Sequence, residues 1–275
     1  MTPIIWTYWH QGFDQAPYVV KQCINRLQLL HPDAAIHLLD QHSIYDFADI
    51  VPIPANKWGK IVLPHRSDLL RTQLLIKYGG TWLDPTAFCL TKLTDWLPQY
   101  AEKGLFLFHR PGKDRIISNW FIAAEKDNKL LSQLYHSLVD YWNHNDFRNL
   151  GRRDPSVLEY WSNRILNGRS LALSQLWLSP LFTKLLRLYP YMIYHYMFYH
   201  LIKTKPECRA LYEAMPRISA DGPHRLQRLG LLAPATAEGR DLIHNKTVPL
   251  LKLNWKISTQ DIPSDSHLAY LFKQQ

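Results

Sequence analysis

The stretch "SDLLRTQLLIKYGGTWLDPTAF", Ser67 to Phe88, decides the fold. Its apolar residues recur at helical spacing until Gly79 and Gly80, and an extended pattern then leads to Asp84. We expect Ser67 to cap the helix and the two glycines to end it in a tight return. The stretch therefore predicts a helix followed by a strand, with Asp84 at the strand end, where α/β sheets collect their ligands.

Three polar residues share one face of the expected helix. Asp68, Arg71 and Thr72 lie together, on the side away from the leucines, because positions i, i+3 and i+4 are neighbours on a helix. A carboxylate accepts hydrogen bonds from hydroxyls and a guanidinium donates them in a fixed fork, so this face suits a polyol. Two simpler interpretations stay open. The acid and the arginine can form an exposed ion pair worth roughly a few tenths of a kcal/mol, and Asp84 can be a turn residue before Pro85.

Strand and helix patterns alternate through the first 150 residues. Strands are expected over 3–9, 35–40, 81–90, 105–110 and 119–125, and helices over 18–30 and 128–144. This alternation predicts an α/β sandwich with a mostly parallel sheet. Beyond about residue 150 the pattern becomes mainly helical, which we interpret as an elaboration of one catalytic unit. The expected division is an α/β core over 1–150, a helical insertion over 151–215 and a C-terminal segment over 216–275.

Composition favours a globular protein of the reducing cytosol. The 275 residues are 47% hydrophobic, which is enough to fill a sizeable core. The three cysteines, Cys23, Cys89 and Cys208, are far apart and form no Cys-x-x-Cys pair, so they suggest neither a disulfide framework nor a zinc site. The opening "MTPIIWTYWHQGF" has no basic region and reads as a strand from residue 3, so we expect no cleaved signal.

The positive charge is concentrated after residue 100. Residues 1–100 contain 8 Lys/Arg and 8 Asp/Glu, so the whole net charge of +9 lies in residues 101–275. Such an imbalance suggests an anionic partner: a nucleotide diphosphate, an acidic glycan, a lipid phosphate or a nucleic acid. A solvated basic surface without a dedicated ligand is the simpler interpretation. A nucleic-acid-binding protein is disfavoured, because the basic and aromatic residues form no compact recognition motif.

The segment 171–203 is unusually rich in leucine and tyrosine. Prolines and basic residues interrupt it, so it lacks the apolar run of about 20 residues that a membrane helix needs. We expect a pair of buried helices that supply core aromatics. Peripheral contact with lipid headgroups and a wall for a bulky acceptor are the alternatives.

Several enzyme classes lose support because their motifs are missing from the sequence. It contains no Gly-x-Gly-x-x-Gly turn, no phosphate loop that ends in Gly-Lys-Ser/Thr, no Gly-x-Ser-x-Gly elbow and no His-Glu-x-x-His. Dinucleotide-dependent dehydrogenases, P-loop ATPases, serine hydrolases and zinc proteases of these types are therefore disfavoured.

The block "SDLLRTQLLIKYGGTWLD" resembles the hallmark of the nucleotide-sugar transferases that include yeast-type initiating mannosyltransferases and clostridial toxin glucosyltransferases (glycosyltransferase family 32-like, with an Asp-x-Asp motif). It is most similar to their bacterial relatives, the capsular polysaccharide synthesis proteins. The segments "PIIWTYWHQG", "SNWFIAAEKDNKLL", "ADGPHRLQ" and "PLLKLNWK" extend the resemblance over most of the chain, although the region from about 150 to 215 matches weakly. The resemblance implies a GT-A fold, a nucleotide-sugar donor and a retaining transfer.

The resemblance also implies a set of site residues. Trp9 would stack on the nucleotide base, although a tryptophan at a strand end is also a common core residue. Catalytic roles would fall to Asp68, Arg71 and Asp84. Nucleotide or donor contacts would involve Thr7, Tyr8, Trp9, Asp68, Arg71, Asp84, Thr86, His224, Lys252 and Lys256.

The metal motif departs from the family pattern. It reads Asp84-Pro85-Thr86, so a threonine replaces the second acid, as is common in the capsular relatives. Since a divalent ion on a diphosphate prefers charged oxygen ligands, dependence on Mg²⁺ or Mn²⁺ is in doubt. Asp84 is the expected metal ligand and His244 a further candidate. Basic residues of the second half can replace the metal's charge: His224, Arg225, His244, Lys246, Lys252 and Lys256.

The sequence therefore predicts a retaining glycosyltransferase. Its donor would be a UDP- or GDP-sugar, and its acceptor a growing or lipid-linked bacterial surface glycan, such as capsule, O-antigen or lipooligosaccharide. Positioning and electrostatics would carry most of the acceleration, so no strong base need be visible. The expected location is the cytoplasm. If the segment 171–203 contacts lipid, the protein would lie at the inner face of the plasma membrane. A glycan- or lipid-binding scaffold that has lost catalysis is the alternative that the Thr86 substitution suggests.

Overall fold

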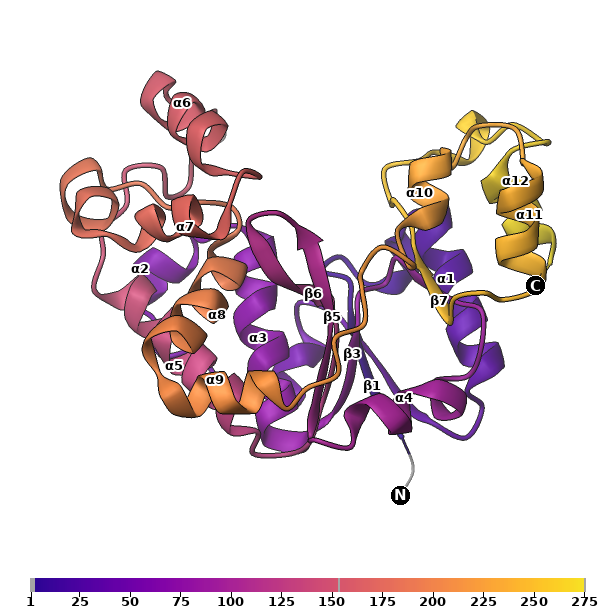
Figure 1. Cartoon of the computed structure of the whole chain (residues 1–275), viewed down its shortest axis with the longest axis horizontal. Coiled ribbons are helices and arrows are strands. Elements are labelled where there is room, and N and C mark those ends of the chain that lie inside the picture. The colour runs from indigo at the N-terminus through magenta and orange to yellow at the C-terminus, as the bar shows by residue number, and fades with distance from the viewer. Residues whose placement is uncertain (1–2, 153, 275) are drawn as a thin grey trace. The chain divides into compact units, whose positions relative to one another are not determined.

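The computed structural model describes residues 3–152 and 154–274. The chain forms two compact units, drawn as ribbons in Figure 1, and each unit combines separate stretches of sequence. Unit 1 contains Met1–Asp46, Gly80–Glu102 and Ser219–Gln275, and unit 2 contains Phe47–Gly79 and Lys103–Ile218. Each unit is therefore assembled from stretches that alternate along the sequence. The division expected from the sequence, into 1–150, 151–215 and 216–275, uses continuous stretches and stays a prediction.

Three parallel strands form the sheet of unit 1. β1 (Ile4–Tyr8) lies between β2 (Ala35–Leu39) and β3 (Gly80–Leu83), with Ile5 opposite Ile36 on one side and Thr81 on the other. Helix α1 (Tyr18–Leu30) makes the crossover from β1 to β2 and buries its apolar face. The predicted strands and helix are confirmed here, because periodicity and the Pro17 start signal agree with the backbone.

A second, two-stranded ribbon and three short helices complete the core of unit 1. β4 (Ala87–Cys89) pairs antiparallel with β7 (Leu250–Lys252), so the C-terminal stretch is paired with the segment that follows Asp84. Buried leucines of the C-terminal helices pack with Phe88 and Cys23 in one cluster. The three C-terminal helices are α10 (Arg225–Leu229), α11 (Ala237–His244) and α12 (His267–Lys273). The unit also contains α4 (Leu93–Ala101) and the short turns η1 (Phe13–Gln15), η2 (Ser43–Asp46) and η5 (Thr259–Asp261).

Unit 2 is built around a long hairpin. β5 (Leu105–Gly112) and β6 (Arg115–Ala124) pair antiparallel across a two-residue connection, which is too short for a parallel crossover. The expectation of a mostly parallel sheet therefore holds in unit 1 and is wrong for this hairpin. α3 (Leu63–Tyr78) and α5 (Lys129–Asn143) pack against each other in the same unit. The α/β class predicted from the alternating pattern is confirmed.

The helix predicted from Ser67 begins earlier than expected. α3 starts at Leu63, with Pro64 in its first turn, so Ser67 lies inside the helix and does not cap it. Its hydroxyl and carbonyl oxygens instead accept hydrogen bonds from Arg71. The predicted end is confirmed, since α3 stops at Tyr78.

Two glycines are required after α3. Gly79 and Gly80 have φ angles of 70° and 94°, in the region that side chains rarely adopt. A Cβ atom on Gly79 would lie 2.8 Å from the Lys126 nitrogen, and one on Gly80 would lie 2.7 Å from the Ile4 oxygen. Backbone conformation and close approach therefore both demand glycine at the start of β3.

The described residues from 154 to 213 are helical or irregular, which confirms the predicted change after residue 150. The expected pair of buried helices in 171–203 is a series of short turns followed by one buried helix, α8 (Ile193–Thr204), because Pro180 and Pro190 interrupt the segment. The remaining helical elements of unit 2 are α2 (Ala55–Trp58), α6 (Val157–Leu166), α7 (Leu171–Ser174), η3 (Gln175–Leu178), η4 (Leu181–Leu186) and α9 (Pro206–Glu213). Among the described residues, none of the helices is both long and apolar enough to span a bilayer.

Candidate functional site

Asp84 lies at the carboxyl end of a parallel strand, as predicted. β3 ends at Leu83, and the Ala87 amide closes a turn by donating to the Asp84 carbonyl oxygen at 2.9 Å. Pro85 occupies the second position of this turn, where its fixed φ is favourable. The chain then enters β4, so Asp84 and Thr86 bracket one tight turn of unit 1.

Lys252 completes this turn from β7. The β4–β7 register places Ala87 opposite Lys252, and the Leu253 amide donates to the Thr86 carbonyl oxygen at 2.7 Å. The Lys252 ammonium donates to Asp84 Oδ2 at 2.9 Å and to Thr86 Oγ1 at 2.7 Å. The resulting ion pair keeps 15% of the Lys252 side chain and 25% of the Asp84 side chain exposed. We call Asp84, Thr86 and Lys252 the turn cluster.

Trp82 fixes the other side of the carboxylate. Its indole nitrogen donates to Asp84 Oδ1 at 3.0 Å, while the ring is almost completely buried in the sheet. Both carboxylate oxygens of Asp84 therefore accept hydrogen bonds from groups held by strands. This arrangement suits a carboxylate that holds a position and a charge.

The metal expectation can be tested against these donors. A divalent ion would need Asp84 and Thr86 as ligands, but the Lys252 ammonium already contacts one oxygen of each. Charges of +2 and +1 about 4 Å apart repel by roughly 8 kcal/mol at an effective dielectric constant of about 20. Among the described residues, no group of three His, Cys, Asp or Glu side chains is arranged to hold a metal. In the described conformation an ammonium therefore occupies the contacts to Asp84 and Thr86 that a divalent ion would need.

His224 lies next to this ribbon, where its surroundings disfavour the protonated form. The Lys252 amide donates to the Pro223 carbonyl oxygen, and His224 Nδ1 lies 2.7 Å from Gln227 Oε1. Burial lowers the pKa of His224, and the positive charge of Lys252 lowers it further, although the bond to Gln227 acts in the opposite direction. Lys252 is therefore the cation of this part of the site.

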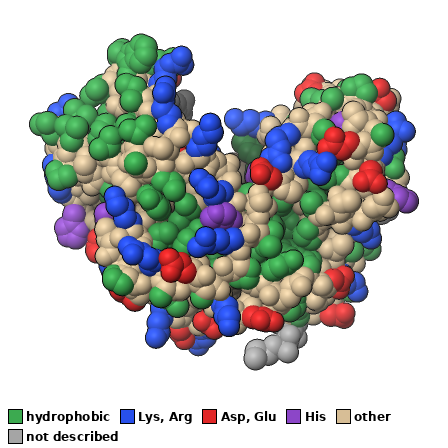
Figure 2. All heavy atoms as spheres, viewed as in Figure 1, with side chains coloured by type: hydrophobic (Ala, Val, Ile, Leu, Met, Phe, Trp, Pro, Cys, Tyr) green, Lys and Arg blue, Asp and Glu red, His purple; other side chains and the backbone are tan. Residues whose placement is uncertain are grey.

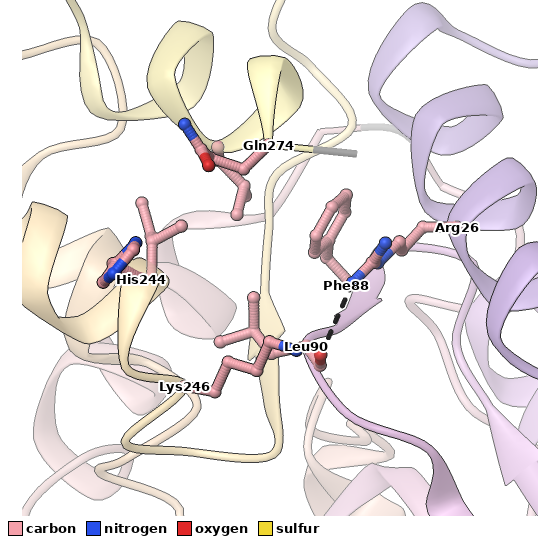
Figure 3. Close-up of a pocket in the computed structure, with 8 residues that line it drawn as sticks. Arg26, Phe88, Leu90, His244, Lys246 and Gln274 are labelled. Atoms are coloured by element: carbon pink, nitrogen blue, oxygen red, sulfur yellow. Dashed lines mark hydrogen bonds between the residues drawn. The ribbon is translucent and has the colours of Figure 1, made fainter.

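His244 and Lys246 line a different pocket of unit 1. Figure 3 shows both with Arg26 and Gln274 around a cavity of about 80 Å³, and Arg26 donates to the carbonyl oxygens of Cys89 and Leu90. The described lining residues include no carboxylate, so this pocket offers His244 no acidic co-ligand for a metal. Arg225 is elsewhere, in an exposed ion pair with Glu238.

The predicted base-stacking residues of unit 1 are only partly accessible. Trp9 packs edge-on against Trp255 with ring centroids 5.7 Å apart, and the Lys256 ammonium lies 5.8 Å from the Trp255 ring centroid. The Tyr8 hydroxyl is 2.8 Å from His10 Nδ1. Thr7 has no exposed surface, so its predicted nucleotide contact disagrees with the described conformation.

Asp68 and Arg71 form a separate buried cluster in unit 2. Arg71 Nη2 lies 3.4 Å from Asp68 Oδ1, and 9% of the Asp68 side chain and 7% of the Arg71 side chain are exposed. Asn119 Nδ2 donates to Asp68 Oδ1 at 2.8 Å, while Arg71 Nη1 donates to the Asn119 carbonyl oxygen. The alternative of an exposed ion pair is therefore wrong. We call Asp68, Arg71 and Asn119 the helix cluster.

The surroundings of the helix cluster are aromatic. Thr72, also on the predicted face, is fully buried and its hydroxyl lies 3.3 Å from the Tyr194 hydroxyl. His65 Nδ1 lies 3.7 Å from Asp68 Oδ2, and its ring packs against both Trp142 and Tyr189. α3 is buried on nearly all sides, so its polar face is enclosed as well as its leucines.

Three residues of these clusters escaped the sequence reasoning: Trp82, Asn119 and Trp255. Each lies inside a segment that resembles the family, and Trp82 and Trp255 are also close in sequence to the predicted site residues Asp84 and Lys256. Trp82 precedes Asp84 by two positions, and on a strand such residues share a face. That spacing was the available signal, whereas the pairings of Asn119 and Trp255 depend on tertiary structure.

A family model and several known proteins match parts of the chain. A family model described as "Capsular polysaccharide synthesis protein" matches residues 1–149. The O-glycosyltransferase braB of Annulohypoxylon truncatum is 29% identical over 157 residues, which cover 50% of this chain and 37% of that protein. The O-glycosyltransferase PaGT of Phomopsis amygdali is 26% identical over 156 residues, which cover 50% and 38%. The chain thus matches less than two thirds of the length of these curated relatives.

A third relative and one solved structure are also named for sugar transfer. The glycosyltransferase afumC of Aspergillus fumigatus is 27% identical over 165 residues, which cover 53% of this chain and 40% of that protein. The solved structure "PaToxG Glycosyltransferase" is 16% identical and covers 66% of this chain and 77% of its own, with a TM-score of 0.39. A TM-score of this size supports no assignment.

Proposed function

The chain belongs to the capsular polysaccharide synthesis protein family, and on that premise we propose that it is a glycosyltransferase that uses a nucleotide-sugar donor. The relatives' names support sugar transfer in general. The turn cluster carries the proposal, because it places an ammonium and a carboxylate at the carboxyl end of β3. The proposed architecture is the GT-A fold that the family resemblance implies.

We propose that Lys252 stabilises the leaving diphosphate. When the bond between the sugar and the diphosphate breaks, negative charge develops on the diphosphate, and a fixed cation nearby lowers the barrier. Asp84 and Thr86 hold the ammonium in place, so little reorganisation is needed at the moment of reaction. Under this proposal Lys252 has the role that a divalent ion has in metal-dependent relatives, and transfer is independent of Mg²⁺ and Mn²⁺.

We propose a retaining mechanism, with acceptor attack on the face from which the diphosphate leaves. The sugar would pass through a transition state with oxocarbenium character, and Asp84 would orient charge without attacking the sugar. The hydrogen bonds from Trp82 and Lys252 to its two oxygens support this role. A product of the same anomeric configuration as the donor, measured by NMR, is the expected result.

The assignment of Asp68 and Arg71 to donor-sugar binding rests on the motif and is also part of the proposal. Their hydrogen bonds to Ser67 and Asn119 fix the orientation of both side chains, which supports a precise recognition role. The Asp68→Asn variant keeps the size of the side chain and removes its charge. We expect it to raise KM for the sugar donor at unchanged affinity for the free nucleotide diphosphate.

We propose a UDP- or GDP-sugar as donor and a growing bacterial surface glycan as acceptor. The test is a screen of the purified chain against UDP-, GDP- and CMP-sugars, each with EDTA, Mg²⁺ or Mn²⁺, read by thermal shift and by sugar release. A ligand that binds only the folded state raises its melting temperature. We expect one nucleotide sugar to stabilise the chain and to be turned over equally well in EDTA.

The alternative is a glycan- or lipid-binding scaffold without catalysis, which the replacement of the second motif acid by Thr86 favours. Stabilisation by a nucleotide sugar without turnover would select this alternative. Turnover that disappears in EDTA and returns with Mn²⁺ would instead contradict the proposed role of Lys252.

A further inference from the structure

Helix α6 of unit 2 has the opposite polarity from an ordinary surface helix. Its large apolar side chains are exposed by 45% to 77%: Val157, Leu158, Tyr160, Trp161 and Ile165. Its buried or half-buried positions include Ser162, whose hydroxyl donates to a backbone carbonyl oxygen within the helix. In a surface helix the apolar stripe normally faces the core. The outward face of α6 therefore needs a partner to remove its apolar surface from water.

The helix is firmly attached to the rest of unit 2. Leu166, at its end, is buried in one cluster with Trp177 and Phe182. Asn167 Oδ1 accepts a hydrogen bond from the Trp177 indole nitrogen at 2.8 Å, and the Gly168 amide donates to Asp114 Oδ2 at 2.8 Å. This attachment lies at the C-terminal end of α6 and leaves the outward face of the helix exposed.

Exposed leucines next to this cluster extend the apolar surface. Leu176, Leu181 and Leu185, from the turns that carry Trp177 and Phe182, are exposed by 43%, 48% and 67%. Figure 2 shows hydrophobic side chains gathered over the end of unit 2 where Figure 1 places α6 and α7. We call the exposed residues of α6 and these leucines the apolar face.

Positive charge surrounds the apolar face. Residues 148–187 of the sequence contain seven Lys/Arg and two Asp/Glu. In the described part of the chain, Arg152, Arg164 and Arg169 are exposed and form no ion pair with a carboxylate. The one acid on α6, Glu159, accepts a hydrogen bond from the buried Asn149 and is half-buried. Arginine therefore dominates the charge at the rim of the apolar face.

We infer that the apolar face docks on an anionic phospholipid bilayer. Tyrosine and tryptophan are the side chains that favour the boundary between acyl chains and headgroups, and arginines beside them attract phosphate. A protein partner of acidic character would satisfy the charge, but the exposed aliphatic side chains of α6 fit a fluid acyl layer. This inference places the membrane contact mainly on α6, outside the segment 171–203, and does not rest on the proposed activity.

The test is co-sedimentation of the full chain with vesicles of phosphatidylcholine alone and of phosphatidylcholine with phosphatidylglycerol. We expect binding to the anionic vesicles only. The double variant Trp161→Ser/Ile165→Ser should lower the partition coefficient by roughly tenfold or more, and Arg164→Gln/Arg169→Gln by a similar factor. Because all four side chains are exposed, the melting temperatures should stay close to that of the unchanged chain.

Matched controls are Leu29→Ser and Ile50→Ser, which remove exposed apolar side chains outside the apolar face. Both should bind anionic vesicles like the unchanged chain. The inference is overturned if the unchanged chain does not bind anionic vesicles, if it binds neutral ones equally well, or if the α6 variants bind normally. Sedimentation velocity without lipid additionally measures the oligomeric state of the chain. A dimer that Trp161→Ser/Ile165→Ser converts to a monomer, without vesicle binding, would make the face an interface between two copies and overturn the lipid assignment.

Discussion

The two units contain ion pairs of the same chemistry in different surroundings. In the turn cluster, Lys252 and Asp84 keep 15% and 25% of their side chains exposed and hold each other at 2.9 Å. In the helix cluster, Arg71 and Asp68 keep 7% and 9% exposed and share hydrogen bonds with Asn119. A partly exposed pair can meet a ligand and should cost less stability when broken than a buried pair does.

This difference in exposure separates a role in activity from a role in stability, which the sequence motif from Ser67 to Asp84 does not distinguish. Changes in the turn cluster should mainly alter activity. Changes in the helix cluster should alter the free energy of unfolding whether or not they also alter activity. The expected results below compare the two clusters in this way, from the largest effect to the smallest.

Removal of the buried acid should have the largest effect on stability. Asp68→Ala leaves the Arg71 guanidinium buried without its carboxylate and removes the acceptor of Asn119. We expect the free energy of unfolding to fall by about 3–5 kcal/mol, measured by urea denaturation. The matched control is Asp49→Ala, which breaks the exposed pair with Lys77 in the same unit and should lower the free energy of unfolding far less. Equal losses in the two variants would contradict the distinction.

Removal of the partly exposed cation Lys252 should give the opposite pattern. Lys252→Met keeps the length of the side chain and removes the charge proposed to stabilise the leaving diphosphate. We expect kcat/KM for the nucleotide sugar to fall by roughly 10²–10³-fold, with a smaller loss of unfolding free energy than in Asp68→Ala. Arg228→Gln, which breaks an exposed pair with Asp221 in the same unit, is the control and should leave activity unchanged. Full activity of Lys252→Met would refute the proposed role of this lysine.

Much of this arrangement was predictable from short-range signals. Hydrophobic periodicity and start signals predicted β1, α1, β2 and α5, and the two glycines predicted the return into β3. The boundary at Ser67 was wrong because Leu63-Pro64 supplies an earlier helix start. The mostly parallel sheet was wrong in unit 2 because a two-residue connection between two strong strands forms a hairpin.

The pairings within each cluster were beyond the sequence. Lys252 is far from Asp84 along the chain, and only the β4–β7 register brings its ammonium onto the carboxylate. The burial of Arg71 depends on β6, which carries Asn119, and helical spacing says nothing of that strand. The exposure of the apolar side chains of α6 was likewise not predictable, since a helical pattern does not say which face of the helix meets the core.

A histidine near the helix cluster should also make stability depend on pH. His195, fully buried in unit 2, has a pKa lowered to about 4, chiefly by burial, although the negative charge of Asp68 acts in the opposite direction. Its ordinary pKa is about 6.5, so the unfolded chain binds a proton at higher pH than the folded chain. Stability should therefore fall as the pH decreases from about 6.5 to 4, by roughly 3 kcal/mol from this group.

The measurement is urea denaturation at several pH values, compared between the unchanged chain and His195→Gln. Other buried histidines contribute to both proteins, so the difference between the two pH profiles isolates His195. We expect His195→Gln to have the smaller loss of stability between pH 6.5 and 4. Parallel profiles would show that this imidazole is protonated in the folded state.

The smallest expected effect tests why the turn cluster fits an ammonium. Thr86→Asp restores the second acid of the motif, but the Lys252 charge remains between the two carboxylates, so Mn²⁺ should not stimulate this single variant. In the double variant Thr86→Asp/Lys252→Ala the ammonium is gone and two hard oxygen ligands face the same space. We expect Mn²⁺ to raise its residual sugar transfer by roughly tenfold, with no such response in Lys252→Ala alone. If the single Thr86→Asp variant already depended on Mn²⁺, the ion would be able to displace the Lys252 ammonium. The identity of residue 86 alone would then decide whether this turn binds a metal ion or an ammonium.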